Sequence, residues 1–185
     1  MNIFHLDQDP EVAAQMMCDK HVVKMVTEYG QLLSTAHRVL DGELYYDKTK
    51  NGRKIKRWRL PEKAREKILY KASHVNHPSN IWARESNENY RWLYKHFVAC
   101  AKEYEHRYGR VHMTYANLKG LLWYSPKNIN QFSGLTRFAQ AMPDHCKRID
   151  AVDAYRVYYI VEKSYMAKWT NRQMPLWYQQ GVGGF

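Results

Sequence analysis

Six polar residues recur at alternating steps of three and four between positions 21 and 38. This spacing places their side chains on one face of a single helix. The set contains one carboxylate, one imidazole and two cations among neutral groups: His21, Lys24, Glu28, Gln31, Thr35 and Arg38. A carboxylate beside an imidazole and cations can be held ionised or tuned as a general base. A solvent-exposed helix face has the same composition, so the pattern predicts either a catalytic site around Glu28 or a polar surface.

Histidine offers a second chemistry, which is metal binding. The chain has nine histidines, and His74 and His77 are three residues apart. Pro78 follows directly and places that pair at the start of a helix rather than within one. No His-Glu-x-x-His pattern occurs, and the three cysteines form no Cys-x-x-Cys pair. We therefore expect neither a metal site nor a cofactor, and a His-dependent metallo-nuclease is the least favoured alternative.

Helices are the elements that must position these residues. Asp9 followed by Pro10 is typical of a helix start, and Gly109 is typical of a helix end. Apolar residues repeat with helical spacing and predict helices over residues 10–40, 61–73, 77–108, 113–123 and 150–169. The apolar stripe expected to join the core from the third of these is Trp82, Leu93, Phe97, Cys100 and Tyr104. Residues 124–149 and 170–185 are expected to form loops. The fold class is therefore all-α, with residues 1–185 forming a compact single-domain helical bundle.

Length and composition exclude several classes of protein. A chain of 185 residues with 14% aromatic residues can bury a core, which excludes wholesale disorder. No run of about 18 apolar residues occurs, so no membrane-spanning helix is expected. The N-terminus lacks the basic and apolar segments of a secretory signal, and three cysteines are an odd number for a disulfide scaffold. We expect a cytoplasmic protein of a bacterium or a phage-infected host, with its oligomeric state left open.

Positive charge is concentrated in one segment. The formal net charge is +11, and residues 48–67 hold ten Lys or Arg against two Glu, so this window carries +8 and the rest of the chain +3. Asp41-Gly42 and Asn51-Gly52 are turn signals that bracket the start of the window. We expect residues 41–60 to form an exposed basic loop or ribbon that is inserted in the helical fold. Cations that neutralise phosphates, with Trp58 available for stacking, favour a nucleic-acid partner. The alternative is a solvated loop with Trp58 anchored in the protein core.

Several short motifs resemble a known family when they are taken in order. Asp19-Lys20-His21-Val22 followed by Glu28 has the order and spacing of the helix that carries the catalytic carboxylate in pyrimidine dimer DNA glycosylases of the phage endonuclease V type. Asn76-His77-Pro78 and the tail Pro175-Leu-Trp177-Tyr178 are also similar to that family. The resemblance implies a compact helical enzyme that acts on damaged or modified pyrimidines in double-stranded DNA.

The resemblance also implies a mechanism. In that family an N-terminal α-amine attacks C1′ of the target nucleotide, expels the base and forms a Schiff base, and β-elimination can then nick the strand. An α-amine suits this role because its ordinary pKa, about 7.7–8.0, leaves much of it neutral near pH 7–8. The family exposes the amine of a small second residue, whereas residue 2 here is Asn, so the candidate amine is that of Met1. The expected catalytic residues are Glu28, His21, Met1 and Lys24.

The remaining expectations concern DNA contacts. The residues expected to bind nucleic acid are Lys20, Arg38, Arg53, Lys54, Lys56, Arg57, Arg59, His77, Arg84, Trp177 and Tyr178. A different class of function stays open: a DNA-binding or DNA-modification accessory protein without hydrolytic chemistry. That alternative needs the basic segment but not Glu28.

Overall fold

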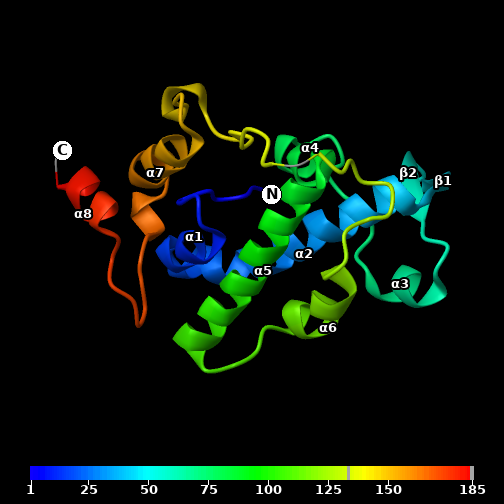
Figure 1. Ribbon diagram of the computed structural model, residues 1–185, viewed down its shortest axis with the longest axis horizontal. Coiled ribbons are helices and arrows are strands. Elements are labelled where there is room, and N and C mark those ends of the chain that lie inside the picture. Colours follow the sequence, from blue (N-terminus) through cyan, green and yellow to red (C-terminus); the bar gives the residue numbers. More distant parts are fainter. Residues whose placement is uncertain (133, 184–185) are drawn as a thin grey trace.

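The computed structural model describes residues 1–132 and 134–183, and in this part of the chain the fold is mainly helical (Figure 1). The helices are α1 (Pro10–Met16), α2 (Asp19–Asp41), α3 (Lys63–Ile68), α4 (Pro78–Glu85), α5 (Asn87–Tyr108), α6 (Met113–Leu122), α7 (Ala151–Glu162) and α8 (Leu176–Val182). Two strands, β1 (Glu43–Lys48) and β2 (Lys54–Arg59), and two short 3₁₀ turns, Asp144–Cys146 and Ser164–Met166, complete the described elements. The all-α prediction is confirmed.

The centre of the molecule is the crossing of α2 and α5 (Figure 1). The apolar face expected on the first helix is buried, with Val22 and Leu33 fully enclosed. The core stripe expected from residues 82 to 104 is buried as well, and the Cys100 thiol donates to the Val22 carbonyl oxygen at 3.5 Å. Burial of a large apolar side chain stabilises a fold by about 1.5–3 kcal/mol, so this seam holds α2 in place.

Two helices that the periodicity predicts as continuous are each broken. The segment 10–40 forms α1 and α2, because Met17 and Cys18 are extended and buried between them. The segment 77–108 forms α4 and α5, because Ser86 is extended and its side chain accepts from the Asn89 amide as the N-cap of α5. Around the first break the apolar residues Ala13, Met17, Cys18 and Val22 keep helical spacing, so periodicity did not reveal it. At the second break residues 84–89 are all polar, and the capping serine is the local signal that the prediction missed.

Other boundaries also differ from the prediction. The helix expected over 61–73 is only Lys63–Ile68, and the one expected over 150–169 ends at Glu162. The tail expected to be a loop contains α8, and its last two residues, 184 and 185, lie outside the described residues. Gly109 does end α5, in the left-handed conformation with φ 67°, and α6 agrees with its prediction to within one residue. No helix in the described ranges has the length and apolar character needed to cross a bilayer.

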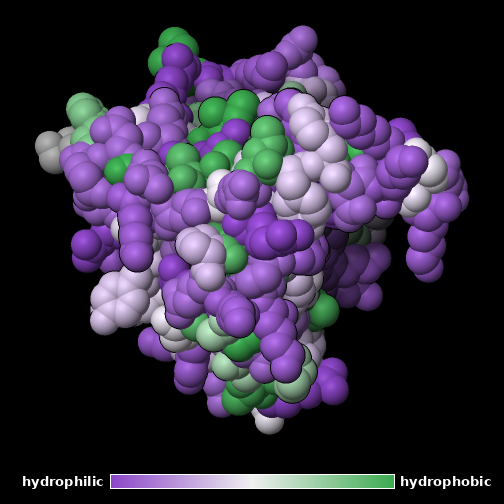
Figure 2. Space-filling model, turned by 90° about the vertical axis from the view of Figure 1, so that its right-hand side faces the viewer, coloured by the Kyte–Doolittle hydropathy of each residue, from purple (hydrophilic) through white to green (hydrophobic). Residues whose placement is uncertain are grey.

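The basic segment forms a β-hairpin. Strands β1 and β2 pair antiparallel, with Glu43 opposite Arg59 and Lys48 opposite Lys54. Gly52 in the turn has a φ of +77°, which glycine adopts without strain. The hairpin extends beyond the C-terminal end of α2 (Figure 1), and hydrophilic residues cover most of the molecular surface at that end (Figure 2). The ribbon prediction for residues 41–60 is therefore confirmed.

Candidate active site at the N-terminus

The N-terminal amine lies beside the carboxylate of α2. The Met1 nitrogen is 3.6 Å from Glu28 Oε2, and Lys24 Nζ is 3.0 Å from Glu28 Oε1. Lys24 and Glu28 are one turn apart on α2, so the helix alone brings that pair together. The Glu28 side chain is 14% exposed, whereas that of Lys24 is 64% exposed. Three of the four residues expected to be catalytic are thus adjacent, and the carboxylate is mostly buried.

The side chain of Asn2 fixes the position of the amine. Asn2 Oδ1 accepts from the Tyr155 hydroxyl at 2.8 Å, and Asn2 Nδ2 donates to the Ala141 carbonyl at 2.9 Å. The Met1 side chain is only 4% exposed, and Asn80 Nδ2 lies 3.7 Å from its sulfur. These partners stand 79 to 153 residues from the N-terminus, so no local sequence pattern could identify Tyr155 or Asn80 as part of the site.

His77 lies at the edge of this site. It is the N-cap of α4, and its Nδ1 accepts from the Ser79 amide at 3.2 Å, which leaves Nε2 available to another partner. Burial lowers the pKa of His77; the Met1 amine and His74 lower it further, and Glu28 opposes them. The Ser79 hydroxyl, in the first turn of α4, lies 3.5 Å from Asn2 Oδ1, which places the start of this helix beside the N-terminal segment. The sequence predicted a DNA contact at His77 and did not include it among the catalytic residues.

His21 does not have the environment expected of a catalytic group. Its ring is buried, stacks on Phe4 with 4.1 Å between centroids, and bonds through Nδ1 to the Tyr159 hydroxyl. Burial, with Lys163 and Lys24 nearby, lowers the pKa of His21 to about 3. His21 is therefore neutral near pH 7, and its contacts hold the N-terminal segment against α7.

Arg38 corrects the prediction of an exposed DNA contact. Its side chain is fully buried, and its guanidinium donates to the carbonyl oxygens of Trp58 and Leu69 at 3.0 and 2.7 Å and to the Glu66 carboxylate. Burial raises the pKa of Glu66, but hydrogen bonds from Lys71, the Leu60 amide and Arg38 outweigh this effect and lower the pKa to about 2. Arg38 therefore ties α2 to the base of the hairpin and to α3, where DNA cannot reach it.

Of the other DNA contacts expected from the sequence, Tyr178 is buried and its prediction is wrong, whereas Arg84 is only partly buried. Tyr178 is 4% exposed and packs on Trp169 with 4.8 Å between ring centroids. Arg84 has a guanidinium nitrogen that is buried without a hydrogen-bond partner, and burial lowers its pKa. Trp177 is half-buried, with its indole nitrogen 3.3 Å from the Met16 sulfur. Lys20 remains exposed on the first turn of α2.

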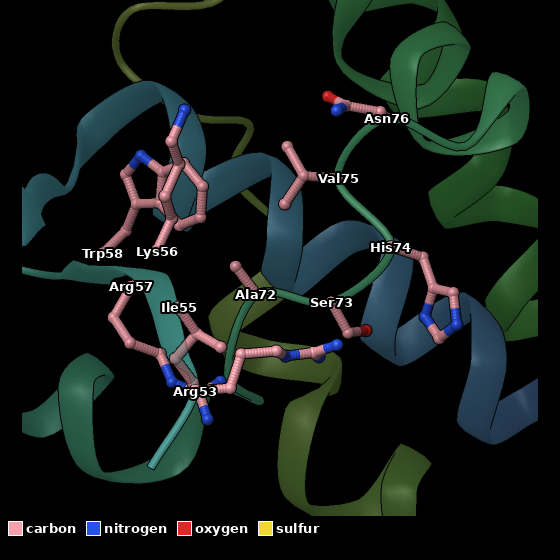
Figure 3. Close-up of a pocket in the computed structure, with 10 residues that line it drawn as sticks. All are labelled: Arg53, Ile55, Lys56, Arg57, Trp58, Ala72, Ser73, His74, Val75 and Asn76. Carbon is pink, nitrogen blue, oxygen red and sulfur yellow. The ribbon is translucent and has the colours of Figure 1, made fainter. Parts of the chain in front are cut away.

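The hairpin borders a cavity of about 400 Å³ that faces the loop leading to His77. Figure 3 shows the side chains of β2 on one side of it and residues 72–76 on the other, with Arg53 extending toward Ser73. Its lining is Arg53, Ile55, Lys56, Arg57, Trp58, Ala72, Ser73, His74, Val75 and Asn76. Residues 72–76 lead directly to His77, the N-cap of α4 at the edge of the N-terminal site. Only a few residues of the chain therefore separate the cavity beside the hairpin cations from that site. Lys54 and Arg59 of the same hairpin are also exposed.

The described residues hold one group of three possible metal ligands close enough to share an ion, namely His145, Cys146 and Glu162. It contains none of the histidines that the sequence singled out. The spacing of His145, Cys146 and Glu162 in the sequence did not indicate this group.

Comparison with known proteins assigns the family. The family described as pyrimidine dimer DNA glycosylase matches residues 1–117 of the 185. Searches of curated proteins and of solved structures returned no match. The matched span includes the hairpin and ends within α6, so the aromatic tail lies outside it. Because the match covers more than half of the chain and includes Met1, Glu28 and His77, the chain belongs to the pyrimidine dimer DNA glycosylase family, and its substrate class is DNA.

Proposed function

We infer that the protein releases damaged or modified pyrimidines from double-stranded DNA through covalent attack by the Met1 amine. The observation that carries this proposal is the 3.6 Å separation between the Met1 nitrogen and Glu28 Oε2. A nucleophile and a carboxylate at this distance can act on the same sugar carbon.

The chemical steps follow from these two groups. The neutral amine forms a bond to C1′ while the bond from C1′ to the base breaks, and the base leaves with the bonding electrons. Glu28 stabilises the positive charge that develops on the sugar and accepts a proton from the attacking amine. Opening of the sugar ring, with a proton delivered to its oxygen, leaves a Schiff base between Met1 and C1′. Loss of a proton from C2′ and departure of the 3′ phosphate would then nick the strand.

Neighbouring side chains position the reacting pair. Lys24 holds one Glu28 oxygen at 3.0 Å, and the other oxygen faces the amine. Lys24 is mostly exposed, so we assign it a modest positioning role. His77 offers its Nε2 at the edge of the N-terminal site, where it can bind a phosphate or move a proton.

The hairpin supplies the DNA-binding surface in this proposal. Its exposed cations include Arg53, Lys54, Lys56 and Arg59, and Arg57 lines the adjoining cavity. Such cations neutralise phosphates without reading sequence, so they hold the duplex while the N-terminal site acts on it.

Borohydride trapping tests the covalent mechanism. The protein is mixed with duplex DNA that carries an abasic site or a pyrimidine dimer, reduced, digested and sequenced by mass spectrometry. We expect a stable adduct on the α-nitrogen of Met1 and loss of that adduct after selective N-terminal acetylation. Base release without an adduct, or an adduct on a lysine side chain, would contradict the assignment of the amine.

A second candidate is a DNA-binding accessory protein without hydrolytic chemistry. The exposed charge of the hairpin favours it, because that surface needs no catalytic group. In this case neutralising the hairpin abolishes function, and Glu28→Gln has little effect.

A further inference from the structure

A second groove lies across α5 from the N-terminal site. It has a volume of about 550 Å³, and α5 contributes to its wall Asn87, Tyr90, Arg91, Tyr94, Lys95, Val98 and Lys102. The opposite wall comes from α6 and the turn after it, through Tyr115, Trp123, Tyr124 and Ser125. The α5 residues Leu93 and Cys100 are buried outside the groove lining, with Cys100 bonded to α2. The groove therefore faces away from the helix that carries Glu28.

Aromatic rings on the groove are open to solvent. Trp123 is 64% exposed and Tyr124 72% exposed, although both rings are large enough to be expected in a core. Tyr94 meets Trp123 edge to face at 5.7 Å between centroids, and the Tyr94 hydroxyl donates to the Lys119 carbonyl at 2.9 Å. These contacts set the orientation of two rings and leave the Trp123 ring accessible for stacking.

Cations border the same rings. Within residues 1–132 and 134–183, Arg91, Lys95 and Lys102 form no ion pair, and Glu11 is the one acid on the groove wall. Arg91, Lys95 and Lys102 follow at helical spacing, so their charges line one face of α5. Exposed aromatic faces beside unpaired cations are the combination that binds single-stranded nucleic acid, since bases stack on the rings and phosphates pair with the cations.

We propose that the groove between α5 and the turn after α6 binds a short single-stranded segment of DNA. This site is separate from the duplex-binding hairpin and from the amine–carboxylate pair. Trp123 stacks on a base, and Arg91 and Lys95 neutralise adjacent phosphates. The site would hold a displaced or flanking unpaired strand while the other face acts on the duplex.

Binding of a fluorescein-labelled oligothymidylate of about eight nucleotides to the full chain tests this, measured by anisotropy at two salt concentrations. We expect Trp123→Ala to weaken binding by about 5- to 100-fold, as the loss of one stacked base requires. Arg91→Ala should weaken it and also flatten its salt dependence. Tyr165→Ala is the matched control, because Tyr165 is 79% exposed but lies outside the groove.

The outcomes are distinguishable from failure of the proposed catalysis. Glu28→Gln should bind the oligonucleotide as the parent does, whatever its effect on base release. Equal loss in Trp123→Ala and Tyr165→Ala, or no loss in either, would overturn the groove assignment, and so would loss of oligonucleotide binding in Arg53→Ala alone. Binding of thymidine monophosphate as tight as that of the oligonucleotide would show a nucleotide site instead of a strand site. Unfolding temperatures of all variants exclude a loss of fold as the cause.

Discussion

The N-terminal site and the β1–β2 hairpin use charge in opposite ways. At the N-terminus one mostly buried carboxylate lies 3.6 Å from the Met1 amine, and residues as distant as Tyr155 hold the N-terminal segment in place. In the hairpin most cations are exposed, and their neighbours are local, such as Lys54 over the ring of Tyr46 at 3.9 Å. Charges interact strongly where burial lowers the local dielectric, so one buried carboxylate can have a large effect on a reacting group. Exposed charges are screened by water and salt, so a binding surface needs many of them. Variants of one region should therefore leave the function of the other intact.

The largest effect is expected from Glu28→Gln. Removing the carboxylate while keeping its shape should lower base release by about 10²- to 10⁴-fold, since the sugar cation loses its stabilising charge. Single-turnover kinetics with saturating DNA measure this directly. Glu105→Gln, an exposed carboxylate on α5 outside the groove, is the control. Unchanged base release in Glu28→Gln would remove the distinction between a catalytic site and a binding hairpin.

Arg38→Met should cause the next largest effect, on stability. It removes a buried cation and leaves carbonyl oxygens and Glu66 without their donor, so we expect a loss of about 3–5 kcal/mol in the free energy of unfolding. Chemical denaturation measures it. Arg53→Met, an exposed arginine of the hairpin, should change stability by less than about 0.5 kcal/mol. Similar values for the two arginines would contradict the burial of Arg38.

Acid should destabilise the helical core. Burial lowers the pKa of His37 and of His96 to about 4 and that of His21 to about 3. The unfolded chain binds protons to these groups below about pH 6.5 while the folded chain does not, so stability should fall as pH drops from about 6.5 toward 4. Denaturation midpoints between pH 4 and 8 check this trend. His37→Gln should flatten the curve, and exposed His145→Gln should not.

The smallest effect is expected from a single hairpin cation. Arg53→Ala should reduce the slope of log affinity against log salt by about one, because one phosphate contact is lost. It should leave the rate of base release at saturating DNA unchanged. Titration of duplex DNA at several salt concentrations measures the slope. A fall in the catalytic rate with no change in slope would assign Arg53 to the N-terminal site.

The sequence was informative where a structure depends on neighbouring residues. Asp9, Gly109 and the turn at Gly52 act within a few residues of themselves, and each does what its type predicts. The pairing of Lys24 with Glu28 follows from helical geometry alone. The break at Met17–Cys18 lies where apolar residues keep helical spacing, so periodicity predicted an unbroken helix there. The break at Ser86 lies in a polar run, where a capping serine is a signal that periodicity does not use.

The polar stripe on α2 shows where local reasoning ends. Glu28 and Arg38 share one face of one helix, yet Glu28 faces the amine and Arg38 is enclosed by residues 58–69. Which residues of a helix face are buried depends on segments, distant in the sequence, that pack against that helix. The same holds for Tyr178, whose burial against Trp169 no nearby residue indicates.

By itself the sequence determined the helical class, the basic ribbon and the order of motifs that marks the family, because each is a property of short segments or of their succession. The tertiary structure alone decided that the Met1 amine meets Glu28, that Arg38 is structural, and that Trp123 borders a second groove. Those outcomes are set by contacts between residues far apart in the chain, such as Asn2 with Tyr155, and such contacts form only when the whole core packs.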